Sequence, residues 1–336
     1  MSAVLTVYTT APSSHGLTGE QFQARTVEVG RWTEEAGHRG LLVYTDNSLI
    51  DPWAVAQYLI ERTDRLVPLV AVQPLYMHPF FLARRIASIA HLYGRPVDLN
   101  LVTGGFAGHQ MELGDVLEHD ERYERLTEYG KVVGKLLRSQ KPVTHLGRHY
   151  SLNRLAPSLP MPVELLPRLC VSGASAACAA TGNALGALRL SYPHPIAEYA
   201  ATPGALEGCG IRFGIIARED AADAWREAHA RFPADEFGER LHDVAAGQVE
   251  SRWHQELSQR AAEDAAAREC YWLYPFRAYK TFCPYLVGDY TTVGQAIARY
   301  LELGVGTIIL DVPKDEEDLW HARIALERAQ LAFAEC

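Results

Sequence analysis

Short apolar runs alternate with amphipathic stretches along the first 140 residues of the chain. The four runs lie at residues 4–8, 41–44, 66–72 and 97–102. The run at 41–44 is too apolar to have a solvent face, as expected for a parallel strand that is covered on both sides. After each run, apolar positions recur at helical spacing, in residues 21–36, 53–62, 79–93 and 119–136. Four strand-then-helix units predict a parallel sheet, and an α/β fold of the (β/α)8 TIM barrel type is the commonest way to continue them over 300 residues.

The second half of the chain continues the barrel pattern with two interruptions. Later strands are expected at residues 168–171, 187–190, 211–217 and 305–310, followed by a closing helix over 315–333. The first interruption, about 142–160, reads as a hairpin excursion around Gly147. The second, about 220–285, reads as a helical insertion after strand seven that ends in an aromatic segment, 271–285, suited to a lid or a partner surface. Because no repeat or low-complexity linker is visible, we expect a single domain over residues 1–336.

Composition and charge exclude several classes of protein. The hydrophobic fraction of 48% and charged fraction of 22% are near the averages of soluble globular proteins. A net charge of -9 argues against non-specific nucleic-acid binding, which needs a basic face. No apolar stretch approaches the length of a membrane span and no secretory leader is visible, so we expect a cytoplasmic protein. The six cysteines form no C-x-x-C pair, so we expect no metal site and no disulfide framework.

The residues that follow the strands are the candidates for ligand contact, because a (β/α)8 barrel binds its ligand at the carboxyl ends of the strands. The fourth strand stops in the sequence Asn100-Leu-Val-Thr103-Gly-Gly, and an amphipathic helix opens at His119-Asp-Glu-Arg-Tyr123. The alternative is a capped strand end and a surface helix with nothing bound.

The stretch Ser172-Gly173-Ala174-Ser175 joins the fifth strand to a helix of small residues that is expected to stop near Gly182. It offers backbone N–H groups and a hydroxyl at the positive end of the helix dipole, which suits a phosphate. It could equally be an N-cap.

Taken together, "NLVTGG" at 100–105 and "HDERYERLTEYG" from residue 119 resemble the luciferase-like flavin monooxygenases, most closely the two-component alkanesulfonate monooxygenases. The resemblance implies that Asn100, Thr103 and Tyr123 lie along a flavin, and that Ser172 to Ser175 hold its phosphate, with Ala174 in place of one of the family's serines. It also implies FMN used as FMNH2, a separate NAD(P)H:flavin reductase as partner, a homo-oligomer, and a non-prolyl cis peptide near residues 71–73.

Departures from this resemblance lie where the sulfonate enzymes have polar side chains. Leu49, Gly214, Val312 and Lys314 stand in place of a cysteine, a histidine, a tyrosine and another histidine, while Arg212 is kept and Tyr192 replaces a tryptophan. We therefore expect a more apolar pocket that is roomier at Gly214.

Four residues are the catalytic candidates: Arg212, Tyr192, His15 and Lys314. An arginine at a strand end is costly to desolvate unless it is paired, so Arg212 favours an anionic or peroxide-bearing ligand over a structural ion pair. For His15 and Lys314 the choice is between substrate contact or proton transfer and a solvated loop position.

The function expected from these features is oxidation of an organic substrate by O2 and reduced FMN. The substrate would be a larger or specialised metabolite, free or carrier-bound, and not a simple alkanesulfonate. Two alternatives stay open: an F420-dependent oxidoreductase on the same barrel, and a non-catalytic flavin-binding relative.

Overall fold

The computed structural model describes residues 5–105, 107–157, 159–246, 252–263 and 270–334. The chain folds into two compact units. The first unit comprises Met1–Pro12, Arg31–Arg39 and Leu190–Cys336, and the second comprises Ser13–Gly30 and Gly40–Arg189. Helix α1 (Gly19–Glu35) and strand β8 (Leu188–Ser191) each run along the chain from one unit into the other. The expectation of one domain stays a prediction.

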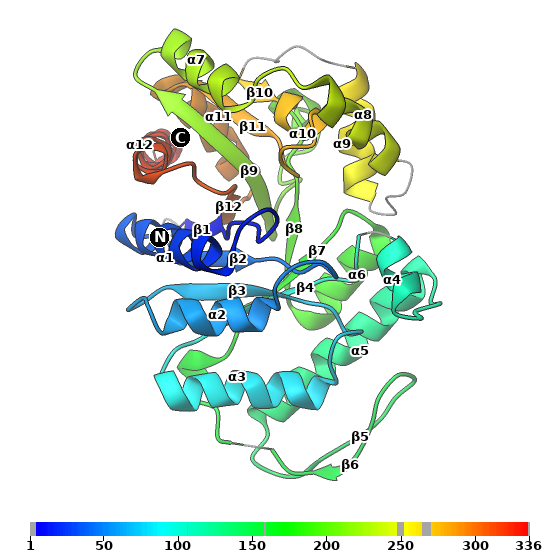
Figure 1. Cartoon of the computed structure of the whole chain (residues 1–336). Helices are drawn as coiled ribbons and strands as arrows, with labels where there is room; N and C mark the ends of the chain where they lie inside the picture. Colours follow the sequence, from blue (N-terminus) through cyan, green and yellow to red (C-terminus); the bar gives the residue numbers. More distant parts are fainter. Residues whose placement is uncertain (1–4, 106, 158, 247–251, 264–269, 335–336) are drawn as a thin grey trace. The chain divides into compact units, whose positions relative to one another are not determined.

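The second unit contains a parallel sheet of four strands in the order β2-β3-β4-β7, with bounds Gly40–Val43, Val67–Val72, Asp98–Leu101 and Leu169–Ser172. Every residue of β2, β3 and β4 is buried, as the apolar runs predicted. The helices that belong to these strands are α2 (Pro52–Ile60), α3 (Pro79–Tyr93), α5 (His119–Arg138) and α6 (Ala176–Leu185) (Figure 1). Leucine, isoleucine and valine side chains from both layers form the core of this unit.

Local sequence explains where the helices of the second unit begin and end. Asp51 accepts hydrogen bonds from the backbone N–H groups of Trp53 and Ala54 at the start of α2, where Pro52 takes the first helical position. Gly94 ends α3 in the left-handed conformation. Helix α6 continues past Gly182, where its end was predicted, and stops at Leu185, because Gly186 is the residue that adopts the left-handed cap.

The second unit also contains a β-hairpin and a short helix. The predicted hairpin is confirmed: β5 (Val143–Leu146) and β6 (Ser151–Leu155) pair in antiparallel fashion. The short helix α4 (Ala107–Glu112) was not predicted, since six residues are too few to show a helical period.

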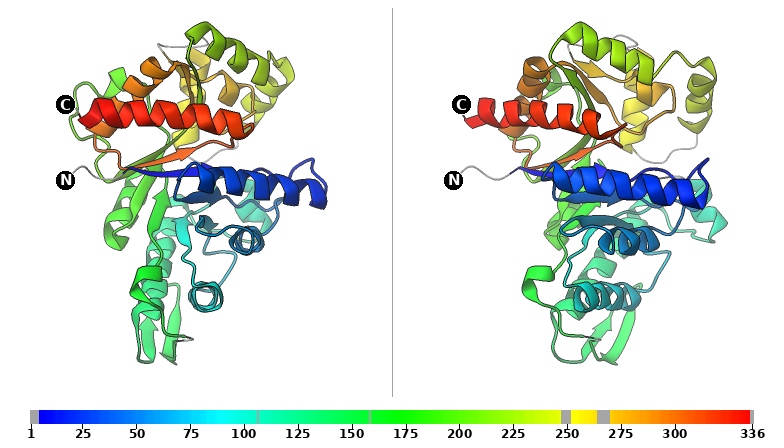
Figure 2. Two further views of the ribbon diagram at one scale, coloured as in Figure 1. Left: turned by 90° about the vertical axis from the view of Figure 1, so that its left-hand side faces the viewer. Right: turned by 60° about the vertical axis from the view of Figure 1, so that its left-hand side comes forward.

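The first unit is built on strands β1 (Thr6–Thr10), β9 (Cys209–Arg218), β11 (Tyr285–Asp289) and β12 (Thr307–Leu310), which pair in parallel, with β10 (Tyr271–Trp272) antiparallel to β11. The helices are α7 (Ala221–Arg231), α8 (Glu236–Ala246), α9 (Arg252–Glu263), α10 (Tyr274–Arg277), α11 (Tyr290–Glu302) and α12 (Glu316–Ala334). Helices α11 and α12 pack side by side (Figure 2).

The aromatic segment 271–285 is buried only in part. Tyr271, Trp272, Phe276 and Tyr285 are all at most 6% exposed and belong to the core of the first unit. Strand β9 is ten residues long, and β12 pairs only with Gly210 to Phe213, so β11 pairs with the second half of β9. Tyr279 and Phe282 are 39% and 40% exposed, so a role of the segment as a lid or partner surface stays a prediction.

The expected cis peptide near residues 71–73 is also wrong. The described part of the chain contains no cis peptide bond. The ordinary trans form costs several kcal/mol less than the non-prolyl cis form.

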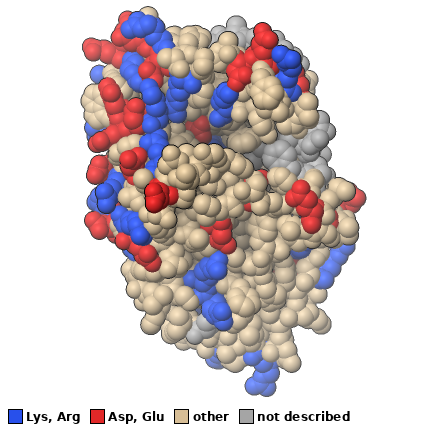
Figure 3. All heavy atoms as spheres, in the orientation of Figure 1, with Lys and Arg blue, Asp and Glu red and all other residues tan. Residues whose placement is uncertain are grey.

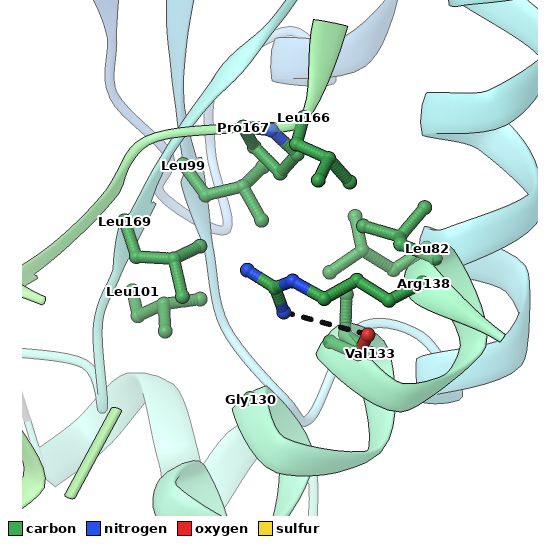
Figure 4. A pocket seen from close by; sticks show the side chains of 11 residues that line it. Leu82, Leu99, Leu101, Gly130, Val133, Arg138, Leu166, Pro167 and Leu169 are labelled. Atoms are coloured by element: carbon green, nitrogen blue, oxygen red, sulfur yellow. Dashed lines mark hydrogen bonds between the residues drawn. The ribbon is translucent and has the colours of Figure 1, made fainter. Parts of the chain in front are cut away.

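An apolar cavity lies between α3, α5 and the strands β4 and β7 (Figure 4). Its walls are mostly leucine side chains, and the guanidinium of Arg138 points across it while Nη1 donates to the carbonyl of Gly134 at 3.5 Å. The cavity volume is about 10 Å³, which is room for about one water molecule. It is a packing defect of the core, too small for a cofactor.

Basic and acidic side chains are interspersed on the face drawn in Figure 3. Among the described residues, no helix has the length and apolarity that crossing a membrane requires.

Candidate active site

The predicted flavin residues of the second unit meet where β4 and β7 end. The two strands pair in parallel, with Asn100 beside Cys170, so their last residues are neighbours. Ser172 Oγ donates a hydrogen bond of 2.7 Å to Asn100 Oδ1. The side chain of Asn100 is only 6% exposed. The structure thus brings together two residues that are 72 positions apart.

Tyr123 reaches the same place from α5. Its hydroxyl donates to the carbonyl oxygen of Ser172 at 3.1 Å. Burial raises the pKa of Tyr123 well above its usual value, so the hydroxyl keeps its proton and remains a donor. Gly173 has φ +146°, and a Cβ at this position would lie 2.4 Å from the Tyr123 hydroxyl oxygen. Only glycine fits between the end of β7 and Tyr123.

Ser175 is the N-cap of α6, because its Oγ accepts a hydrogen bond from the backbone N–H of Cys178 at 3.2 Å. The N-cap alternative is thus what the contacts show. The positive end of the α6 dipole and the loop Gly173-Ala174 remain compatible with a phosphate, and that role stays a prediction.

Gln110 and Arg122 hold the loop that contains Thr103, and sequence reasoning missed both. Gln110 Nε2 donates to the carbonyl oxygen of Thr103 at 3.0 Å, and Arg122 Nη1 donates to Gln110 Oε1. Gly104 has φ +90°, and a Cβ there would collide with Gln110 Nε2 at 1.6 Å. The sequence offered one hint, an arginine directly before Tyr123 that is 4% exposed in the fold.

In the first unit, Arg212 lies on β9 and forms an ion pair with Asp311, which follows β12. Arg212 Nη2 and Asp311 Oδ1 are 2.9 Å apart, and the two side chains are 16% and 10% exposed. Burial raises the pKa of Asp311, but the charge of Arg212 and the hydrogen bonds that the carboxylate accepts outweigh it and hold this pKa below its usual value. The chain itself therefore supplies a counter-charge for Arg212, and an anionic ligand at this arginine stays a prediction.

Asp311 is the centre of a buried polar cluster that the sequence did not indicate. Its Oδ2 accepts hydrogen bonds from Thr281 Oγ1 at 2.5 Å and from Tyr285 OH at 2.9 Å. Tyr192 belongs to the same cluster: burial raises its pKa, while the Arg212 charge and a hydrogen bond with Arg212 lower it, with a net increase. Two predicted residues, Arg212 and Tyr192, are thus neighbours.

The chain matches the luciferase-like monooxygenase family over residues 3–307. It belongs to this family. A relative from Niallia circulans, the 4-(gamma-L-glutamylamino)butanoyl-[BtrI acyl-carrier protein] monooxygenase BtrO, is 33% identical over 309 residues, which cover 90% of each chain.

Two solved structures share the fold. Riboflavin lyase RcaE, solved with modified FMN and riboflavin, has a TM-score of 0.75 and 16% identity, covering 99% of this chain and 92% of that one. An F420-dependent secondary alcohol dehydrogenase, solved with an F420-acetone adduct, has a TM-score of 0.66 and 14% identity, covering 97% and 99%. The predicted (β/α)8 TIM barrel is confirmed.

The four positions at which we expected departures from the sulfonate enzymes have the following contacts within each unit. Lys314 Nζ pairs with Glu227 at 2.5 Å and is about half exposed. The carbonyl of Val312 accepts from Arg231 Nη2 at 2.7 Å. Leu49 lies in the loop after β2, where its N–H donates to the carbonyl of Asp46. Gly214 does not enlarge a pocket, because the ring of Tyr285 fills the space beside it.

The catalytic roles expected for Lys314 and His15 stay predictions. Lys314 has its charge matched by Glu227, which favours the solvated reading of this residue. His15 is exposed in the loop after β1, and its Nε2 lies 3.2 Å from Ser48 Oγ. Within the described residues, no group of three or more histidine, cysteine, aspartate or glutamate side chains could hold a metal ion.

Proposed function

We propose that this protein is a two-component monooxygenase that uses FMNH2, received from a separate NAD(P)H:flavin reductase, and O2. The observation that carries the proposal is the arrangement of Asn100, Ser172 and Tyr123 around Gly173. A Cβ at Gly173 would collide with the Tyr123 hydroxyl, so the backbone of this loop carries no side chain there, which fits a ligand that approaches the backbone closely. Reduced FMN, when bound, supplies the electrons that reduce O2.

The chain's own residues bind the cofactor, orient the substrate and stabilise its negative charge. We infer that the segment Ser172 to Ser175 holds the flavin phosphate at the start of α6, with Asn100, Thr103 and Tyr123 along the rest of the cofactor. Arg212 donates one N–H to Asp311. This ion pair fixes the direction of the guanidinium and leaves it able to donate further N–H groups, with Tyr192, to an anionic group of the substrate.

We infer that the substrate is an organic acid presented as a carrier-bound acyl group. The support is the 33% identical relative, whose name gives an acyl-carrier protein substrate. A partner reductase is supported by the sequence, which shows no G-x-G-x-x-G strand-turn-helix for a dinucleotide. A homo-oligomer remains part of the proposal.

The test combines the purified protein with a flavin reductase, NADH, FMN and 4-(γ-L-glutamylamino)butanoyl carrier protein. We expect the acyl group to gain one oxygen atom by mass spectrometry. Short alkanesulfonates serve as the comparison: sulfite release on the order of one per second or faster would contradict the proposed substrate class. NAD(P)H oxidation by the protein and FMN without the reductase would contradict the two-component scheme.

A second candidate is an F420-dependent oxidoreductase, favoured by the fold similarity to the alcohol dehydrogenase solved with F420. Anaerobic titration with reduced FMN and reduced F420 separates the two. We expect tighter binding of reduced FMN, and the reverse order would favour the second candidate.

A further inference from the structure

A chain of hydrogen bonds in the second unit connects two histidines through an aspartate and a serine. Asp46 Oδ1 accepts from Ser48 Oγ at 2.6 Å and from the Ser48 backbone N–H at 3.0 Å. Asp46 Oδ2 lies 3.2 Å from Nδ1 of His109 on α4. Ser48 Oγ lies 3.2 Å from Nε2 of His15. We call these four residues the His15 relay.

The direction of these hydrogen bonds defines which atom of His15 is basic. Ser48 gives its single hydroxyl proton to Asp46, because a carboxylate can only accept. The Ser48 oxygen must then accept from His15, so Nε2 of His15 carries the proton and Nδ1 carries the lone pair. His15 is exposed. The basic atom of its neutral ring is therefore Nδ1, while the other ring nitrogen is connected through Ser48 to the carboxylate of Asp46.

The surrounding side chains hold the relay in place. Asn47 Nδ2 donates to the backbone carbonyl of His109 at 3.0 Å and to Glu112 Oε2 at 2.9 Å. The hydroxyl of Tyr76 donates to Asn47 Oδ1 at 2.7 Å. Loops after three different strands and helix α4 thus converge on Asp46. The titratable groups that face the relay from these elements are Glu112 and Tyr76.

Helix α4 also connects the relay to the predicted flavin loop. His109 contacts Asp46, and the next residue, Gln110, donates to the carbonyl of Thr103 at 3.0 Å. The relay therefore lies beside the residues proposed to bind the cofactor, within one unit.

We propose that His15 is the residue that takes a proton from the substrate, and that Ser48, Asp46 and His109 position it. This inference rests on the proposed function. Nδ1 of His15 accepts the proton, and the electron pair of the broken bond stays on the substrate. The positive charge on the ring is balanced by Asp46 through Ser48, the role that a carboxylate has beside a catalytic histidine. Overall, substrate–H, O2 and FMNH2 give substrate–OH, water and FMN, and His15 returns its proton to the water formed.

The first test is independent of turnover. The tautomer of His15 is measured from the 15N chemical shifts of its two ring nitrogens, by NMR of protein labelled with 15N-histidine, in wild type, Asp46→Asn and Ser48→Ala. We expect the proton on Nε2 in wild type and a loss of this preference in both variants, because the hydrogen bond to Ser48 selects the tautomer. Asp120→Asn, which removes a carboxylate at the start of α5 bonded to His119, is the matched control and should leave the His15 tautomer unchanged. The same tautomer populations in all four proteins would overturn the relay.

The second test measures catalysis with the reductase and the carrier-bound acyl substrate named above. We expect His15→Gln to lower the rate of product formation by roughly 100-fold or more, the usual contribution of a general base, while reduced FMN binds as in wild type. The limb of the pH–rate profile that reports the base should disappear in His15→Gln. A wild-type rate in His15→Gln would overturn the proposal. Absence of product from wild type would contradict the proposed substrate, and the NMR result would still decide the relay.

Discussion

The ring of Tyr285 occupies the space beside Gly214 that a side chain at position 214 would need. The two residues are partners in the parallel pairing of β11 with β9. A Cβ at Gly214 would lie 2.3 Å from Cε1 and Cζ of Tyr285, far inside van der Waals contact. The hydroxyl at the other end of this ring donates to Asp311. The space that a side chain at position 214 would take is thus filled by a buried tyrosine from the neighbouring strand.

Replacing this glycine should destabilise the protein. Gly214→His places an imidazole against a ring that is 1% exposed, so we expect the free energy of unfolding to fall by roughly 1 to 3 kcal/mol, the range for overpacking a core. Denaturant unfolding measures the change. The double variant Gly214→His/Tyr285→Ala should lose less than the sum of the two single changes. Additive effects would show that the two positions do not compete for space.

Removing the carboxylate of Asp311 should leave the charge of Arg212 buried without its partner. For Asp311→Ala we expect a loss of roughly 3 to 5 kcal/mol in the free energy of unfolding, as for other broken buried ion pairs. Asp223→Ala removes an exposed carboxylate paired with Arg226 and should change stability by less than about 1 kcal/mol. A similar small loss in both variants would contradict this account.

The same pair sets a dependence on pH. The folded pKa of Asp311 lies below its unfolded value, so the stability from this carboxylate is present above about pH 4 and is lost as the pH falls through the folded pKa. Acid unfolding curves of wild type and Asp311→Ala should therefore converge below pH 4. Curves that stay equally far apart down to pH 2 would show that the ionised carboxylate is not the source of stability.

A side chain at Gly173 should disturb the proposed flavin cradle through Tyr123. Gly173→Ala introduces a methyl group 2.4 Å from the Tyr123 hydroxyl oxygen at a φ that favours glycine, so we expect weaker binding of reduced FMN, by tenfold or more. Tyr123→Phe removes that oxygen, and the double variant should recover part of the affinity. Anaerobic fluorescence titration gives both values. Unchanged affinity in Gly173→Ala would place the cofactor elsewhere.

Ser175 should contribute both to helix α6 and to the cofactor. We expect Ser175→Ala to lower stability by about 1 kcal/mol through loss of the N-cap, and to weaken binding of reduced FMN by about 1 to 3 kcal/mol through loss of a hydrogen bond to a charged group. Ser175→Thr keeps the hydroxyl and is the matched control. A loss of stability with no change in affinity would restrict Ser175 to its capping role.

His38 should make the protein sensitive to mild acid. Burial, and then the charge of Arg323, lower the pKa of His38 from its usual value to about 4. A lowered folded pKa means that stability is complete above about pH 6.5 and is lost as the pH falls toward 4. Because the ring is partly exposed, we expect His38 to lower the free energy of unfolding of the wild type by roughly 1 to 3 kcal/mol between pH 6.5 and 4. His38→Gln should not show this decrease. A stability curve for His38→Gln that runs parallel to the wild-type curve between pH 6.5 and 4 would contradict the prediction.

The sequence by itself determined the element types and the barrel fold. Apolar runs such as 66–72 have no polar face, a pattern typical of strands that are covered on both sides. Pro52 and Gly94 mark the start and the end of helices, because their backbone conformations are restricted locally. Glycines that follow the strand ends identified Asn100 and Ser172 as candidates, while Tyr123 became one through the resemblance to the luciferase-like family.

Only the tertiary structure decided how the polar side chains are paired. Arg212 and Asp311 are 99 positions apart, and a single sequence carries no record of which strand lies beside which. The same holds for Tyr285 beside Gly214 and for His15 beside Ser48. Whether a buried charge is a ligand-binding group or one half of an ion pair depends on distances of a few ångströms between remote segments, because electrostatic and hydrogen-bond energies are decided at that range.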